Sequence, residues 1–246
     1  MTDDGFFGAE VAARYDDDLG EHGRPDVIEA TVDLVAGLAG EGRALEFAVG
    51  TGRLAIPLAQ RGVPVHGIDR SRAMIERLRA KPGGELVHVE VGDMTSTRVP
   101  GSFSMVYLVF NTIMNLVTQD AQVACFQNAA AHLGPGGVFL IETMVPDLRH
   151  LPPGQTLVPF RSDATGFGID EYDTLTQGLV SHHIDLADGV PRYSSGPFRY
   201  VWPSELDLMA RIAGLRLRDR WADWARSPFT AESRSHVSVW ERPTDR

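Results

Sequence analysis

The fold is decided by residues 44–74, whose sequence is ALEFAVGTGRLAIPLAQRGVPVHGIDRSRAM. The short apolar run 44–49 predicts a strand that is buried on both faces of a parallel sheet. It ends at the Gly-Thr-Gly turn of residues 50–52, where two glycines let the backbone bend sharply without a Cβ in the way. Apolar residues at helical spacing follow over 53–61, and a second strand is expected over 63–69. The stretch therefore predicts a strand–turn–helix–strand unit of an α/β protein.

An acidic residue, Asp69, stands at the end of the second strand, 17 residues after Gly52. A carboxylate at this place accepts both hydroxyls of a ribose in nucleotide-binding folds. Residues 50–55 also match the G-x-G-x-x-G/A fingerprint of dinucleotide-binding proteins, although strand–helix turns that bind nothing match it too. We therefore expect a ribose-bearing ligand at this turn, with a plain structural turn as the alternative.

Three features favour S-adenosylmethionine over a nicotinamide dinucleotide as that ligand. Glu46 lies inside the first strand, where a carboxylate is costly unless it is paired or meets a cation. The α-ammonium group of S-adenosylmethionine supplies such a cation, whereas a dinucleotide offers only phosphates there. About 45 residues precede the first strand, whereas short-chain dehydrogenases begin with theirs. The chain also lacks a Tyr-x-x-x-Lys pair, because Lys81 is its only lysine.

Four segments in chain order carry a resemblance to a known family. Residues 46–53 (EFAVGTGR) and 69–74 (DRSRAM) resemble the first two motifs of class I S-adenosylmethionine-dependent methyltransferases. Residues 91–94 (VGDM) resemble the third motif, and 133–137 (LGPGG) resemble the turn before the fifth strand. Ala48 departs from the pattern, since it stands where the first glycine of the first motif is usual. The resemblance implies a Rossmann-like fold that binds S-adenosylmethionine.

The resemblance also assigns roles to residues near the carboxyl ends of the strands, where open parallel sheets bind ligands. Asp69 would accept from the ribose, and Asp93 from the adenine amino group, unless Asp93 only forms a turn. Met74 would pack on adenine or be purely structural, and Asn111 would contact the cofactor or cap a helix. The predicted cofactor-binding residues are Glu46, Ala48, Gly50, Gly52, Arg53, Asp69, Arg70, Met74, Asp93, Met94, Phe110 and Asn111.

Catalytic candidates are fewer, because methyl transfer is an in-line displacement that needs a base only when the acceptor loses a proton on attack. Tyr15 and His182 are the predicted catalytic residues, with His183 and Glu142 as alternatives. Tyr15 resembles the N-terminal tyrosine that covers the cofactor in small-molecule N-methyltransferases, including those acting on amino sugars. Because side chains alternate along a strand, only one of the two histidines can face the site. No metal is expected, since the sequence has neither a Cys pair nor H-x-x-x-H spacing.

The remaining sequence completes the predicted architecture. The fold class is α/β, with a seven-stranded, mostly parallel Rossmann-like methyltransferase sheet, helices on both faces and an antiparallel β flap inserted after strand 5. We expect one domain over 1–246, made of N-terminal helices (1–42), a cofactor-binding core (43–145), the flap (146–202) and a closing helix with two strands (203–246).

Within the flap, residues 146–166 predict a loop because they are rich in Pro, Gly and polar residues. Residues 167–176, 179–186 and 192–201 predict strands, with a turn at 188–189. His132, ahead of the 133–137 turn, is predicted to be a helix-terminal residue favoured by the macrodipole.

Composition limits the partners. A net charge of −10 argues against nucleic acid or an anionic membrane surface as the main partner. No apolar run reaches 18 residues, so no membrane span is expected, and the default compartment is the cytoplasm. The single cysteine, Cys125, is expected to be a buried structural thiol. A homodimer is left open.

The function predicted from these features is methyl transfer from S-adenosylmethionine to an N or O atom of a small molecule. A secondary metabolite or an amino sugar is the suggested acceptor. Two alternatives stay open at this point: an NAD(P)-dependent oxidoreductase, and a regulator that binds S-adenosylmethionine without turnover.

Overall fold

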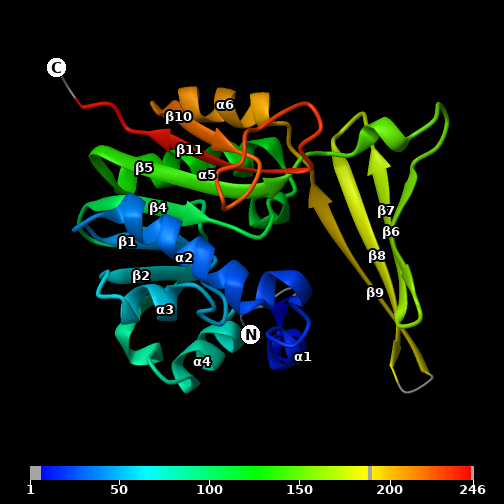
Figure 1. Cartoon of the computed structure of the whole chain (residues 1–246), viewed down its shortest axis with the longest axis horizontal. Coiled ribbons are helices and arrows are strands. Elements are labelled where there is room, and N and C mark those ends of the chain that lie inside the picture. Colours follow the sequence, from blue (N-terminus) through cyan, green and yellow to red (C-terminus); the bar gives the residue numbers. More distant parts are fainter. Residues whose placement is uncertain (1–6, 188–189, 245–246) are drawn as a thin grey trace.

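A seven-stranded sheet forms the centre of the computed structural model, which describes residues 7–187 and 190–244 (Figure 1). Its strand order is β10-β11-β5-β4-β1-β2-β3. These strands are β1 (Ala44–Phe47), β2 (Val65–Asp69), β3 (His88–Val91), β4 (Phe103–Leu108), β5 (Leu133–Met144), β10 (Arg216–Trp221) and β11 (Ser235–Glu241). Strands β1 to β5 are parallel to one another, and β11 is antiparallel to β5 and β10. The predicted mostly parallel sheet is confirmed.

Helices cover both faces of this sheet, as the alternation of elements predicts. On one face, α2 (Pro25–Ala39) and α3 (Ala55–Gln60) bury Val32, Val35 and Leu58 against the strands, joined by Leu78 of α4 (Arg72–Ala80). On the other face, α5 (Gln119–His132) and α6 (Pro203–Ile212) pack around Phe126, Phe139 and Trp240. The short helix α1 (Ala9–Arg14) contacts α4 (Figure 1).

Two central strands end earlier than the apolar runs predict. Ala48 follows β1 with φ 52°, and Phe110 and Asn111 follow β4 with φ 59° and 57°. Left-handed backbone costs a non-glycine residue roughly 1–2 kcal/mol, so these positions stop the ladder and turn the chain. Such residues cluster at functional sites when the surrounding structure holds them in place. Both bends lie at the carboxyl edge of the sheet.

The flap is a separate antiparallel sheet of order β6-β7-β8-β9, inserted between β5 and α6. Its strands are β6 (Leu157–Asp163), β7 (Gly166–Asp173), β8 (Gly178–Ala187) and β9 (Val190–Arg199). The predicted loop at 146–166 is wrong in its second half, because β6 lies there. The Pro, Gly and polar content of 146–166 misled the prediction, but Pro159 is tolerated within β6 because β6 is an edge strand, where a missing N–H costs little. The turn expected at 188–189 lies outside the described residues.

A buried polar network joins the root of the flap to the helices behind the sheet. Arg199, at the end of β9, donates to Gln122 of α5 at 2.5 Å and to Glu205 of α6 at 2.8 Å. The Gln122 amide in turn donates to the backbone oxygens of Ile113 and Arg199, at 3.2 and 3.1 Å. Because a buried network is costly when only partly satisfied, separating the root of the flap from α5 and α6 would be unfavourable.

Two simpler expectations concern burial and membranes. Cys125 is fully buried, and burial raises the pKa of its thiol, so it is the inert core residue that the sequence predicts. Among the residues that the structure describes, no helix combines the length and apolar character that crossing a membrane requires.

Candidate active site

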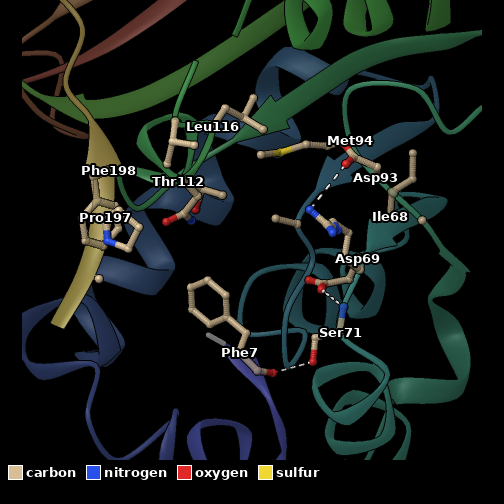
Figure 2. A pocket seen from close by; sticks show the side chains of 16 residues that line it. Phe7, Ile68, Asp69, Ser71, Asp93, Met94, Thr112, Leu116, Pro197 and Phe198 are labelled. Atoms are coloured by element: carbon tan, nitrogen blue, oxygen red, sulfur yellow. Dashed lines mark hydrogen bonds and ion pairs between the residues drawn. The ribbon is translucent and has the colours of Figure 1, made fainter. Parts of the chain in front are cut away.

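A cavity of about 360 Å³ opens at the carboxyl edge of the sheet (Figure 2). One wall carries the first three sequence motifs, and the opposite wall is formed by residues 112–117 and by residues 196–198 of β9. The Phe7 ring projects into the space between Asp69 and Pro197 in Figure 2. The predicted site residues that line the cavity are Ala48, Asp69, Arg70, Asp93 and Met94. The cavity therefore joins the motif loops to the flap.

Asp69 connects the glycine turn to the end of β2. Its carboxylate accepts from the N–H of Gly50 at 2.7 Å and from the N–H of Ser71 at 2.8 Å. The same side chain lines the cavity, so it is held in one orientation at the cavity wall. Gly52 is needed for packing, because a Cβ at this position would lie only 2.8 Å from Cγ of Leu78. It permits close packing of the glycine turn on Leu78 of α4.

Asp93 forms the predicted turn and also lies at the cavity wall. One carboxylate oxygen accepts from the N–H and the hydroxyl of Thr95, at 2.8 and 2.7 Å, which is the expected turn. The other oxygen lies 3.6 Å from the guanidinium of Arg70, and both side chains line the cavity (Figure 2). Making the turn therefore leaves the carboxylate at the cavity wall.

The loop that carries Asp93 is supported from behind by α5, a feature that the sequence analysis missed. Asn128 donates to the backbone oxygens of Met94 and Thr97, at 2.7 and 3.1 Å. His132 Nε2 accepts from the N–H of Val99 at 2.9 Å. His132 ends α5 as predicted. Burial lowers the pKa of its imidazole, so it acts as a neutral hydrogen-bond acceptor and does not favour the helix macrodipole by a positive charge.

Glu46 is a buried carboxyl group, 4 % exposed, on the α2 and α3 side of β1. The hydroxyl of Tyr107 donates to it at 2.8 Å. Burial raises the pKa of Glu46 to about 8, although the Tyr107 hydrogen bond and the charge of Arg53 act in the opposite direction. The carboxyl is therefore mostly protonated at neutral pH and ready to ionise beside a new cation.

Arg53 is the cation at the centre of this acidic region. Its guanidinium donates to the backbone oxygen of His22 at 2.8 Å and lies 5.6 Å from the centroid of the Phe110 ring. Its charge lowers the pKa values of Glu46 and Glu142 against the effect of burial. One arginine therefore offsets part of the cost of two buried carboxyl groups.

Tyr15 lies in the segment that crosses the motif loops. Burial raises the pKa of its hydroxyl to about 12, opposed by Arg53 and reinforced by Asp69 and Glu46, so the group is close to the motif charges. The neighbouring Asp16 is fastened to these loops, because it accepts from Thr51 at 2.6 Å and from Lys81 at 2.7 Å. A phenol with so high a pKa stays protonated and acts as a hydrogen-bonding group.

The bend after β4 is tied to β5 by side chains. Asn111 Oδ1 accepts from the N–H of Met144 at 2.6 Å and makes no helix cap. Glu142 accepts from the N–H of Phe110 at 2.6 Å, and burial raises the pKa of its carboxyl group. These two bonds hold the left-handed pair at the carboxyl edge of the sheet.

Only five of the predicted residues line the cavity, and Met74 and His182 are among those that do not. Met74 is 2 % exposed within the core and is not among the lining residues, which supports its structural alternative. His182 lies on the face of β8 opposite to the buried Leu179, with Nδ1 2.8 Å from the Tyr193 hydroxyl and Nε2 3.5 Å from Glu171. The structure does not bring His182 together with the motif residues.

Comparison with known proteins decides the family. A family model described as a methyltransferase domain matches residues 44–137. The cypemycin N-terminal methyltransferase of a Streptomyces species is 30% identical over 205 residues, 80% of this chain and 82% of the relative. The chain belongs to the S-adenosylmethionine-dependent methyltransferases. Its methyl donor is accordingly S-adenosylmethionine, which decides against the nicotinamide alternative.

Solved structures agree with this methyltransferase fold. The CcbJ methyltransferase from Streptomyces caelestis superimposes with a TM-score of 0.86 at 36% identity, covering 98% of this chain and 99% of that chain. CalS10, an amino pentose methyltransferase from Micromonospora echinaspora solved with bound S-adenosylmethionine, has a TM-score of 0.67. It is 20% identical over 94% of this chain and 95% of its own, and therefore supports the fold alone.

Proposed function

We propose that this methyltransferase transfers the methyl group to an amine nitrogen of a small molecule of the natural-product type. The observation that carries the proposal is the cavity that joins donor-side residues Asp69 and Asp93 to flap residues 196–198. A two-substrate reaction needs one space with a wall for each reactant. The choice of nitrogen is supported by the relative that is named for methylation at an N-terminus.

The donor side fits the cofactor by charge. We propose that Asp69 accepts from the ribose hydroxyls and that Asp93 accepts from the adenine amino group, since both carboxylates line the cavity. Glu46, which can ionise beside a cation, and the positively charged Arg53 lie beside the same bend, so they suit the ammonium and the carboxylate of the methionine part. When bound, the sulfonium cofactor supplies an electrophilic methyl group to a lone pair on the acceptor.

The protein's part in the transfer is alignment. The N–H groups of Gly50 and Ser71 keep Asp69 fixed, and Asn128 and His132 keep the Asp93 loop fixed. Such positioning contributes about 7–11 kcal/mol to two-substrate reactions. Tyr15 remains protonated across the neutral range, so we propose that it positions the reactants by hydrogen bonding and does not remove a proton.

The test combines calorimetry with an acceptor panel. S-adenosylhomocysteine is titrated into the protein, and methyl transfer from S-adenosylmethionine is followed by mass spectrometry. The acceptors are glucosamine and a tripeptide with a free N-terminus, with glucose and the acetylated tripeptide as neutral matches. We expect mass gains of one methyl group on the amines alone. Transfer to the hydroxyl acceptors, or binding of S-adenosylhomocysteine without transfer to any amine, would contradict the proposal.

A further inference from the structure

The flap carries a polar cluster whose role the donor side leaves unexplained. The Ser181 hydroxyl on β8 lies 3.1 Å from Nε2 of His183, two residues along the same strand. Asp170 lies directly opposite Ser181 on β7 and is hydrogen-bonded to its hydroxyl. We call these three residues the flap cluster. An acid, a hydroxyl and an imidazole together form a site that can accept hydrogen bonds.

The flap cluster lies on the side of the flap that packs on the rest of the protein. Side chains alternate along a strand, so Ser181 and His183 share a face with Leu179, which is 4 % exposed. The opposite face carries Ile184 and Tyr193, which are 37 % and 65 % exposed. The face that holds the cluster is therefore turned inward.

The same face reaches the cavity through β9. Gly196 pairs directly with Ser181 across the ladder and is one of the residues that line the cavity. Neighbouring strands are about 4.8 Å apart, so Ser181 and His183 of β8 stand one strand away from Gly196, and Asp170 of β7 stands two strands away, at about 10 Å. In Figure 1, β9 is the strand of the flap nearest to the central sheet. A molecule bound between the donor motifs and the flap would lie beside this cluster.

The charges around the cluster are unbalanced. Within the described residues no arginine or lysine pairs with Asp170, because Arg161 of β6 is paired with Asp185 of β8 at 2.5 Å. Burial lowers the pKa of His183, with Arg161 and His182 lowering it further and Asp185 and Asp170 raising it. Burial also raises the pKa of Asp170. A partly buried carboxylate beside a neutral imidazole is costly unless a cation joins it.

We propose that the flap cluster is the acceptor subsite for an amine that arrives protonated, with Asp170 as its counter-ion and Ser181 as a further hydrogen-bond acceptor. His183 takes the ammonium proton, which frees the nitrogen lone pair to bond to the donor methyl group as the donor's C–S bond breaks. The inference rests on the proposed amine methylation and narrows the acceptor to molecules that carry a positive charge. A charge-assisted hydrogen bond to carboxylate is about twice as strong as a neutral one, which would separate amines from their hydroxyl counterparts.

The test neutralises one carboxylate on each face of β7 in separate variants. Asp170→Asn keeps the shape of the side chain, and Glu171→Gln is the matched control, because Glu171 is the next residue, on the opposite face, and is exposed. Each variant is titrated with S-adenosylhomocysteine and then assayed with glucosamine and the free tripeptide. We expect KM for the amines to rise about tenfold or more in Asp170→Asn, with unchanged affinity for S-adenosylhomocysteine.

The outcomes separate the two proposals. An amine KM that moves less than about threefold in Asp170→Asn, or equally in Glu171→Gln, overturns the subsite while amine methylation stands. A wild-type protein that methylates no amine overturns both. If Asp170→Asn does not fold, as judged by its thermal midpoint, Ser181→Ala takes its place, with a smaller rise in KM expected and an unchanged KM counting against the subsite.

Discussion

The affinity for the cofactor should depend on pH through one buried carboxyl group. Burial holds the pKa of Glu46 near 8 in the free protein, and the carboxyl accepts a hydrogen bond from the neutral Tyr107 hydroxyl. If the cofactor's ammonium group binds beside Glu46, the complex needs the ionised form. Below pH 8 binding must first remove a proton, so affinity falls as pH falls and becomes constant above the pKa.

The magnitude follows from the shift in pKa. Deprotonating a group of pKa about 8 costs roughly 1.4 kcal/mol at pH 7 and 2.7 kcal/mol at pH 6. The dissociation constant of S-adenosylhomocysteine should therefore be about 50-fold higher at pH 6 than at pH 8. At pH 7 about 0.9 proton should be released on binding. Glu46→Gln cannot release a proton, so its dissociation constant should change little over this range.

Calorimetric titration measures both quantities. Dissociation constants are determined at pH 6, 7 and 8 for the wild type and for Glu46→Gln. Enthalpies at pH 7 in phosphate and in Tris differ by the buffer ionisation enthalpy multiplied by the number of protons released. A flat wild-type profile, or the same slope in Glu46→Gln, would refute the assignment of Glu46 to the ammonium group.

Three further outcomes test the site and the fold. Asp69→Ala removes the acceptor of two backbone N–H groups, so S-adenosylhomocysteine should bind at least about tenfold more weakly in calorimetry, and equal affinity in a folded variant would contradict the ribose role. Gly52→Ala adds a Cβ 2.8 Å from Leu78 at a residue with φ 78°, so the free energy of unfolding measured by urea titration should fall by about 2–3 kcal/mol. An unchanged urea midpoint would show that Leu78 moves away without cost. Burial lowers the pKa of His236 to about 3, so the unfolded chain binds the proton first and the free energy of unfolding should fall by about 2 kcal/mol from pH 6.5 to 4.5. Urea titrations at both pH values check this, and His236→Gln should show a smaller fall.

The central sheet could be predicted because its signals are local. The apolar runs 44–49, 63–69 and 103–110 are bounded by glycines or polar residues, and each became a strand of the sheet. The motif carboxylates Asp69 and Asp93 follow strand ends, so their place at the cavity follows from topology. The strand ends were less accurate, since left-handed residues such as Ala48 carry no mark in the sequence.

What was missed depends on tertiary contacts. The hydrogen bonds of Asn128 and His132 to the Asp93 loop join residues about 30 positions apart, and no sequence motif with a fixed spacing predicts them. The Asp16–Lys81 ion pair is of the same kind. Strand β6 was missed because residues 146–166 are rich in Pro, Gly and polar residues, and the cost of Pro159 in a strand depends on whether the strand lies at an edge. Whether His182 or His183 points toward the rest of the protein depends on the register of the flap strands. The alternation of side chains along a strand does not decide between the two.

The flap is one uninterrupted insertion, residues 157–199, whereas the donor-side carboxylates come from residues 46–93. Mutations in the flap that reshape its side of the cavity therefore leave the sequence of the donor side unchanged. Related methyltransferases could therefore exchange the whole insertion during evolution. Such an exchange would change the methyl acceptor and leave the residues that bind the methyl donor unchanged. An exchanged insertion would have to keep the hydrogen bonds that Arg199 makes to Gln122 and Glu205 at the root of the flap.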